Sequence, residues 1–137
     1  EVNGSNPASH YLEMDGAGIL MSAMSIVPKT VEALLKKAGL GKKDVDLFIF
    51  HQASKKVLDS IVRRLDLPEE KVFRWFSDIG NTVSASIPIA LKQVERQGRL
   101  HRGDRIMLVG FGVGFSWASC FMTWKGNGSG PSAFTAD

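Results

Sequence analysis

The sequence predicts an α/β fold in which helices pack on a mixed β-sheet. Segments with helical spacing of apolar residues alternate along the chain with short, continuous apolar runs, a pattern typical of layered α/β folds. Only a glycine-rich turn separates the last two predicted strands, so no crossover helix fits and these strands must pair antiparallel. With 137 residues, 44% of them hydrophobic, the chain is long enough for one domain with a substantial core.

The first predicted helix covers residues 16–38, where apolar residues recur at helical spacing. Pro28 interrupts this stripe and predicts a kink or two abutting helices, and Gly39 is a suitable stop. Residues 46–50 form a short apolar run, which is typical of a strand buried on both faces. Ser54 is a suitable N-cap for a second helix, whose apolar stripe consists of Val57, Leu58, Ile61, Val62 and Leu65.

The second half of the chain continues the alternation. A turn at residues 67–70 leads to a short predicted strand at residues 71–76 and then to a loop at residues 78–82. A third helix ends before Gly98 and is marked by the apolar residues Ile87, Ala90, Leu91 and Val94. The last predicted elements are a turn at residues 101–104, a strand at 105–109, a glycine turn at 110–114 and a final strand at 115–124.

Composition divides the chain into three parts. Residues 1–10 are polar and are expected to form an N-terminal loop, residues 11–124 the folded domain, and the Gly- and Ser-rich residues 125–137 a flexible tail. The chain begins with Glu1 instead of Met, which suggests a processed chain or a cut piece. No continuous apolar run approaches the ~18 residues of a membrane helix.

Charge and cysteine content exclude several classes of protein. The net charge is +3, from 17 Lys and Arg against 14 Asp and Glu, which is too mild to argue for nucleic-acid binding. The aromatic residues Phe48, Phe50, Phe111 and Trp117 lie in apolar strands and not on a basic surface, which also argues against that partner. The single cysteine, Cys120, excludes an internal disulfide framework and a zinc ribbon, and agrees with a reducing cytoplasm.

Two polar residues in loops are candidates for chemistry. His51 directly follows the strand at 46–50, where ligands of open α/β sheets gather, although a structural His bonded at a strand end fits this position equally well. Asn81 lies in the loop before the third helix and could donate two hydrogen bonds to a developing oxyanion. Taken alone, Asn81 is better explained by ordinary turn or cap chemistry.

The glycine turn at 110–114 resembles a nucleotide-binding loop, but a strand follows it instead of a helix, so dinucleotide binding is not expected. Its backbone N–H groups could serve an oxyanion hole, and a tight β-turn explains the glycines equally well.

In the strand that follows, Cys120 shares a face with Ala118 and Met122, which predicts a buried, inert thiol and not a nucleophile.

Lys and Arg side chains gather in three stretches of the chain. A solvated helix face is the usual explanation for such stretches, and a docking site for an anionic partner or for phosphates is the functional alternative. The residues are Lys36, Lys37, Lys42 and Lys43; Lys55, Lys56, Arg63 and Arg64; and Arg96, Arg99, Arg102 and Arg105.

Several of these motifs occur together in a fixed order. Asn81 comes 30 positions after His51, and the motifs that carry the pattern are His51-Gln52-Ala53, Gly80-Asn81-Thr82, Ser84-Ala85-Ser86-Ile87-Pro88, Gly98-Arg99-Leu100, Gly103-Asp104 and Gly110-Phe111-Gly112-Val113-Gly114-Phe115-Ser116-Trp117. This set, over residues 11–124, resembles the C-terminal half of β-ketoacyl-acyl-carrier-protein synthase III. The resemblance implies a thiolase-like half-domain of a condensing enzyme, in which a mixed sheet carries helices packed on it.

The resemblance also implies a mechanism. A cysteine in the N-terminal half, which this chain lacks, is acylated by acyl-CoA, and a malonyl group on acyl carrier protein then decarboxylates and attacks the acyl thioester. His51 and Asn81 match the catalytic His and Asn, which donate hydrogen bonds to the malonyl thioester oxygen as the enolate forms. The backbone N–H of Val113 matches the group that completes the second oxyanion hole.

Other positions match the substrate pocket and the docking face of the family. Gly16, Ala53 and Ser54 match the pocket for the pantetheine of CoA or carrier protein, although Ser54 stands where the family usually has Asn. Lys56 and Arg63 match basic positions of the carrier-protein docking face, and they lie two helical turns apart on one face. Lys55 and Arg64 flank them and are included in the expected docking surface.

The resemblance implies a set of partners and leaves alternatives open. The expected partners are a cysteine-bearing N-terminal half, acyl carrier protein and a second copy of the full enzyme; acyl-CoA and malonyl-carrier protein are substrates. No metal or cofactor, nucleic acid or membrane is expected, and the location is expected to be cytoplasmic. A relative of the same fold could instead transfer acyl groups to oxygen or nitrogen, or build quinolones or polyketide starters. A non-catalytic partner half is the third possibility, and retention of both His51 and Asn81 argues against it.

Overall fold

The computed structural model describes residues 15–112 and 114–126. The N-terminal loop expected at residues 1–10 and most of the expected tail therefore lie outside the described residues. The predicted alternation of helices and strands is confirmed. The elements are α1 Gly16–Ala38, η2 Lys42–Asp44, β1 Leu47–Phe50, α2 Lys55–Leu65, η3 Glu69–Lys71, α3 Phe76–Ile79, η4 Val83–Ala85, α4 Ser86–Arg96, β2 Arg105–Gly112 and β3 Ser116–Thr123.

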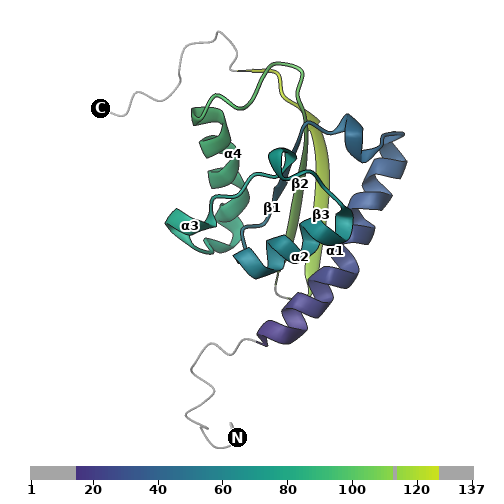
Figure 1. The fold of residues 1–137 in the computed structure, drawn as a ribbon, viewed down its shortest axis with the longest axis vertical. Helices are drawn as coiled ribbons and strands as arrows, with labels where there is room; N and C mark the ends of the chain where they lie inside the picture. The colour runs from purple at the N-terminus through teal and green to yellow at the C-terminus, as the bar shows by residue number, and fades with distance from the viewer. Residues whose placement is uncertain (1–14, 113, 127–137) are drawn as a thin grey trace, which may run out of the picture.

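The described residues contain a mixed three-stranded sheet with the order β1-β2-β3 (Figure 1). β1 pairs parallel with β2, with Leu47 opposite Ile106, and β2 pairs antiparallel with β3, with Gly112 opposite Ser116. Both the mixed sheet and the antiparallel final pair are as predicted. β2 continues three residues beyond the predicted end at position 109, so part of the expected glycine turn is strand.

Helices cover both faces of the sheet, and β1 is buried on both sides as predicted (Figure 1). On one face α1 and α2 pack in a core with Phe48, Phe50 and Val109. On the other face α4 contributes Ala90 and Val94 to a second core with Leu47, Ile49, Phe73 and Ile106. The result is an α/β/α arrangement with the sheet as the middle layer. His51 lies at the edge of this layer, directly after β1.

Helix α1 continues without a break through Pro28, so the chain does not divide into two abutting helices there. A proline inside a helix removes one backbone hydrogen bond, and packing of the helix can compensate for that loss. Ala23, Val27, Val31 and Leu35 supply this packing as a buried stripe along α1. The helix ends as predicted at Gly39, which adopts the left-handed conformation with φ of 66°.

By length and apolar composition alone, α1 could cross a membrane. Its buried stripe, however, packs against α2 and the sheet, and its other positions include the exposed charged residues Lys29, Glu32 and Lys36. This pattern is typical of the core helix of a layered domain, in which one side faces the sheet and the other faces water.

The predicted strand at residues 71–76 is wrong. In its place, η3 is followed by a single parallel bridge between Phe48 and Val72 and then by the short helix α3. The Phe73 N–H donates to the Phe48 carbonyl at 3.0 Å, but the next backbone groups are bound by the side chain of Gln52. The side chain of Gln52 therefore occupies the backbone groups whose hydrogen bonds to β1 would have made this segment a strand.

The last strand differs from expectation in its burial. Most of β3 is exposed, because among the described residues it has a neighbouring strand only on its β2 side. Cys120 is consequently an exposed free thiol, and the prediction that it is buried is wrong. Trp117 on the same strand is 51% exposed, and Met21 of α1 is 73% exposed. Large apolar side chains on both elements thus reach the surface of this chain.

Candidate active site

The candidate site lies where the parallel strands β1 and β2 end at the same edge of the sheet. His51 is the first residue after β1, and its backbone N–H donates to the carbonyl of Val109 on β2 at 2.8 Å. Its ring packs edge-on against Phe111 near the end of β2, with the centroids 5.3 Å apart. Polar groups at this edge of an open α/β sheet are well placed to meet a ligand.

The imidazole of His51 is held by the first residue of α4. Its Nδ1 lies 2.6 Å from the Oγ of Ser86, which is fully buried. The same Oγ accepts a hydrogen bond from the backbone N–H of Gln52 at 3.3 Å. Since Nδ1 is bound to Ser86 and Nε2 has no hydrogen-bond partner among residues 15–112 and 114–126, Nε2 is the ring nitrogen left to contact a ligand.

Burial lowers the pKa of the His51 imidazole below its ordinary value of 6.5. The ring is half-buried, and the charged imidazolium loses more hydration there than the neutral form does. His51 is therefore neutral at neutral pH, which makes it suited to donating or accepting one hydrogen bond without carrying charge.

Gln52 is fully buried and fastens the end of β1 to the segment after η3. Its Nε2 donates to the carbonyls of Phe50 at 2.7 Å and Phe73 at 3.4 Å, and its Oε1 accepts from the Trp75 N–H at 2.7 Å. These bonds hold the loop that carries His51. A buried polar side chain of this kind is stable because all of its groups are paired.

Asn81 lies in the exposed loop between α3 and η4. Gly80 precedes it with a φ of 65° and a ψ of −158°, a conformation that favours glycine. The Oδ1 of Asn81 accepts from the N–H of Val83 at 2.9 Å. Of the two ends of an amide side chain only the oxygen can accept from an N–H, so the end bound to Val83 is the oxygen and the other end is the NH₂ group. That NH₂ is the group left to act as a donor.

The structure connects the loop of Asn81 to the His51 region through the start of α4. The short turn η4 joins the Asn81 loop directly to Ser86, which contacts His51. No hydrogen bond links His51 to Asn81 themselves within residues 15–112 and 114–126. Sequence reasoning did not single out Ser86 or Gln52 individually, although both belong to the quoted motifs.

The remaining predicted pocket residues have local roles that the structure describes. Gly16 is the exposed first residue of α1. Ala53 is half-buried, and its N–H donates to the carbonyl of His51 at 2.9 Å. Ser54 is the N-cap of α2, as predicted, and its Oγ accepts from the Val57 N–H at 3.3 Å. Val113 lies outside the described residues.

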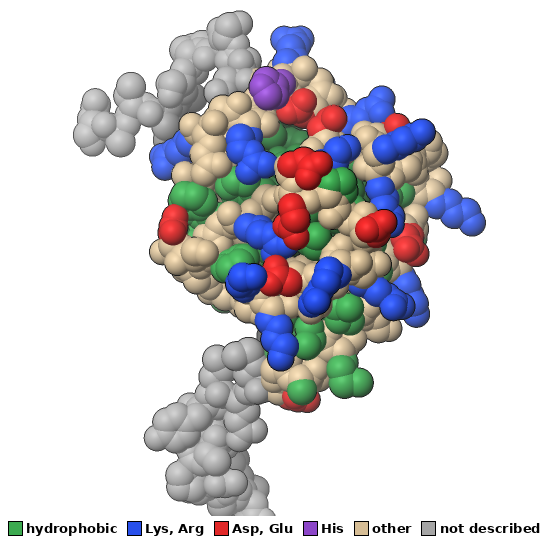
Figure 2. Space-filling model, in the orientation of Figure 1, with side chains coloured by type: hydrophobic (Ala, Val, Ile, Leu, Met, Phe, Trp, Pro, Cys, Tyr) green, Lys and Arg blue, Asp and Glu red, His purple; other side chains and the backbone are tan. Residues whose placement is uncertain are grey.

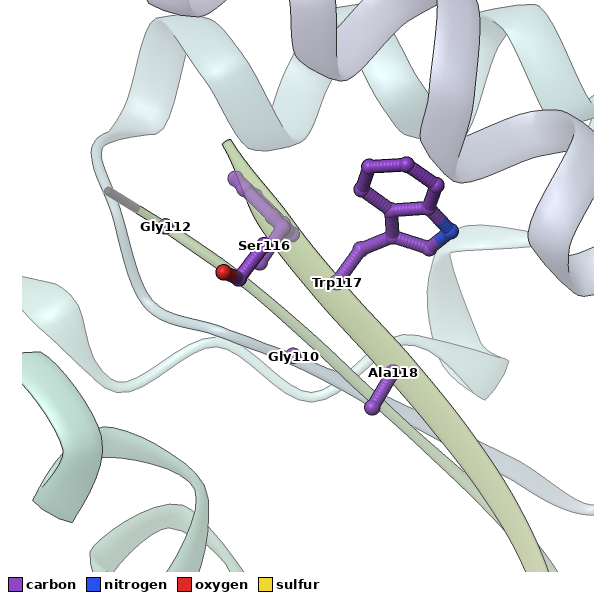
Figure 3. A pocket seen from close by; sticks show the side chains of 6 residues that line it. Gly110, Gly112, Ser116, Trp117 and Ala118 are labelled. Carbon is purple, nitrogen blue, oxygen red and sulfur yellow. The ribbon is translucent and has the colours of Figure 1, made fainter. Parts of the chain in front are cut away.

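A shallow apolar hollow of about 310 Å³ lies beside this edge, at the end of β2 and the start of β3. Figure 3 shows that Trp117 and Ala118 project to opposite sides of β3. Within the described parts of the chain, no group of His, Cys, Asp or Glu is arranged to hold a metal ion. The hollow is lined by Gly110, Phe111, Gly112, Ser116, Trp117 and Ala118.

The four basic residues on α2 are all exposed, but they are not equivalent. Lys55 forms an ion pair with Asp59 at 2.7 Å, and the Nε of Arg63 donates to the Asp59 carbonyl at 3.3 Å. The hydrogen bond from Lys55 lowers the pKa of Asp59, and nearby positive charges act in the same direction. Lys56 and Arg64 make no ion pair with any described residue. On the face shown in Figure 2, Lys and Arg are interspersed with Asp and Glu.

Comparison with known proteins identifies relatives of this chain. Residues 35–124 match the family model described as the C-terminal part of 3-oxoacyl-[acyl-carrier-protein] synthase III. The chain is 38% identical over 123 residues to the β-ketoacyl-[acyl-carrier-protein] synthase III of Rhodopirellula baltica, covering 90% of this chain and 36% of the relative. It is also 38% identical over 120 residues to synthase III 2 of Streptomyces coelicolor, covering 88% and 36%.

Solved structures agree in fold. The structure of 3-oxoacyl-(acyl carrier protein) synthase III from Pseudomonas aeruginosa superposes with a TM-score of 0.82 at 35% identity, covering 90% of this chain and 38% of that one. The enzyme from Thermus thermophilus gives 0.80 at 38% identity, covering 83% and 36%. The chain thus spans little more than a third of the length of these relatives.

Proposed function

Because the chain belongs to the β-ketoacyl-[acyl-carrier-protein] synthase III family, we propose that it supplies the enolate-stabilising donors of such an enzyme. The proposed reaction is a decarboxylative Claisen condensation between an enzyme-bound acyl thioester and malonyl-acyl carrier protein, in fatty acid biosynthesis. The expected thiolase-like α/β fold agrees with the solved structures of this family.

The observation that supports the proposal is that one nitrogen of His51 and one of Asn81 have no hydrogen-bond partner among the described residues. The Nδ1 of His51 is bound to Ser86 and the Oδ1 of Asn81 to the Val83 N–H, so Nε2 and Nδ2 are left for a ligand. In the condensation, the malonyl thioester loses CO₂ and the electron pair of the broken bond forms an enolate. Two donors aimed at the enolate oxygen stabilise the charge as it develops, by roughly 3 kcal/mol each.

The carbon of this enolate then attacks the acyl thioester. A new carbon–carbon bond forms, the acyl–sulfur bond breaks, and the cysteine leaves as a thiolate. We propose that this cysteine belongs to the part of the relatives' length that lies before the matched segment. In this scheme Val113 contributes its backbone N–H to the oxyanion hole for the attacked carbonyl, and Gly16, Ala53 and Ser54 line the pantetheine pocket.

The proposed partners follow from the same scheme. Acyl carrier protein docks on α2 through Lys55, Lys56, Arg63 and Arg64, because the helix begins beside His51. Lys56 and Arg64 support this role most directly, since they are exposed and carry no ion pair in the described part of the chain. The complete enzyme works as a dimer in the cytoplasm, with acyl-CoA and malonyl-carrier protein as substrates and no cofactor.

The test uses the complete enzyme that carries this segment. Purified enzyme is given acyl-CoA, and its acylated cysteine is detected by mass spectrometry; malonyl-carrier protein is then added and the β-ketoacyl product is measured. Release of CO₂ together with the condensed product is the expected result. Acylation followed by transfer only to an oxygen or nitrogen acceptor, or no acylation at all, would contradict the proposal.

A further inference from the structure

The hydroxyl of Ser86 lies between His51 and Gln52, at the edge of the sheet where β1 and β2 end. Its Oγ is 2.6 Å from the Nδ1 of His51 and 3.3 Å from the backbone nitrogen of Gln52. The Gln52 N–H is always a donor, so at this contact the Ser86 oxygen accepts. The single hydroxyl proton of Ser86 remains available for its other partner.

The alternative arrangement has a free-energy cost. If Nδ1 carried the proton and donated it to Ser86, the hydroxyl proton would need a second acceptor. Ser86 is fully buried, and its hydroxyl forms no hydrogen bond to another acceptor in the described ranges. A buried donor without an acceptor is strongly disfavoured, so the hydroxyl proton is directed to an unprotonated Nδ1.

We infer that Ser86 is a positioning residue that holds His51 in the tautomer protonated on Nε2. The free nitrogen of His51 is then a hydrogen-bond donor. This matches an electron-rich acceptor such as a thioester oxygen and excludes a role as a base at the same atom. The inference deepens the function proposed above and rests on it for the identity of the acceptor.

The tautomer can be measured directly by NMR of the complete enzyme that carries this segment, labelled with ¹⁵N in its histidine rings, at a pH at which the rings are neutral. The segment contains three histidines, and a His51→Gln variant assigns the signals of His51. In the wild-type enzyme we expect Nε2 to carry the proton and Nδ1 to show the shift of an unprotonated, hydrogen-bonded nitrogen. A proton on Nδ1 would overturn the inference without any variant.

A matched pair of variants separates the hydroxyl from packing. Thr and Val have the same shape, so Ser86→Thr and Ser86→Val add similar bulk at the buried position and differ by the hydroxyl alone. Ser86→Thr is expected to keep the single Nε2–H tautomer, whereas Ser86→Val shows averaged shifts from a mixture of both. If the larger residues do not fit, wild-type Ser86 and Ser86→Ala provide a second pair that differs by the hydroxyl. Identical ring shifts with and without the hydroxyl would overturn the inference.

Kinetics of the complete enzyme provide the functional readout. Relative to Ser86→Thr, Ser86→Val is expected to lower the kcat of condensation about tenfold, less than removal of a whole oxyanion donor, with KM for the malonyl substrate unchanged. Cysteine acylation is expected to be equal in both. If the wild-type enzyme does not condense at all, the proposed function fails, while the NMR result still decides the tautomer. Equal kcat values would overturn the role of Ser86 in catalysis.

Discussion

The ring of His51 stands at 85° to the ring of Phe111, with 5.3 Å between their centroids. This contact joins the ends of the two parallel strands β1 and β2 and covers one side of the imidazole with an apolar surface. It helps to explain why the pKa of His51 is lowered by burial. The same contact therefore favours the neutral imidazole at the place where the chemistry is proposed.

The lowered pKa of His51 predicts a pH-dependent stability. The folded state binds a proton on His51 less readily than the unfolded state does. Stability is therefore greatest above the ordinary value of 6.5 and falls as the pH drops through the folded pKa. Urea unfolding at several pH values checks this, and His51→Gln is expected to remove part of the dependence. His101→Gln, at an exposed position, is the control; an equal effect from both variants would contradict the assignment.

Substitution of either proposed donor is expected to separate the two half-reactions. His51→Ala and Asn81→Ala should each lower the rate of condensation by about 10²–10³-fold, because each removes a donor from the enolate. Acylation of the cysteine by acyl-CoA should stay near the wild-type rate, since neither donor acts in that step. The two rates are measured separately in the complete enzyme. Wild-type condensation in either variant would refute the assignment.

Cys120 is expected to be dispensable. It is exposed on β3 and has no predicted role in the reaction, so Cys120→Ser should change the free energy of unfolding by less than about 0.5 kcal/mol. The complete Cys120→Ser enzyme should retain most of its condensation activity. A folded but inactive variant, checked by circular dichroism, would return Cys120 to consideration as the nucleophile.

The docking surface on α2 predicts a salt-dependent effect on carrier-protein kinetics. Reversal of two charges in Lys56→Glu/Arg63→Glu should raise the KM for malonyl-carrier protein, because attraction to an acidic partner mainly speeds association. The effect should shrink as ionic strength rises, and a malonyl thioester without the carrier should be used almost normally.

A matched control exists on α1. Lys29 and Lys36 are also exposed and also seven positions apart, so Lys29→Glu/Lys36→Glu makes the same change in net charge on another helix. This control should leave the KM near the wild-type value. If the α2 variant behaves like the control at low salt, the basic residues of α2 serve only to keep the helix solvated.

The exposed apolar surface predicts that the isolated chain does not remain a simple monomer. Trp117 and Met21 are exposed, as is most of β3, and such surfaces favour association. Light scattering after size-exclusion chromatography should show self-association of the 137-residue chain. Co-expression with the cysteine-bearing segment should yield a monodisperse complex. A monodisperse, fully soluble monomer of the chain alone would argue against the proposed partner.

Local patterns in the sequence determined most of the elements and their order. The helical stripes of α2 and α4, the stop at Gly39 and the cap at Ser54 are set by neighbours a few positions apart. The placement of His51 after a buried strand is equally local, because four consecutive apolar residues define β1. The family resemblance is carried by short motifs of the same kind, and the comparisons confirm it.

Interactions between distant segments decided the rest. Pro28 interrupts the sequence pattern but not the helix, because packing in the tertiary core holds α1 together. Residues 71–76 have strand-like composition, yet the buried amide of Gln52 takes the backbone groups that a strand would need. Cys120 is exposed because the described residues place a neighbouring strand on only one side of β3.

The site itself divides in the same way. The sequence identified His51 and Asn81 as candidates, since residue type and position relative to a strand or helix are local properties. It did not reveal that Ser86 binds His51, because 35 positions separate them and only the packing of α4 against the end of β1 brings them together. Which nitrogen of His51 faces a ligand is therefore a property of the tertiary structure: it depends on a buried hydroxyl, whose hydrogen bonds must be satisfied within the fold.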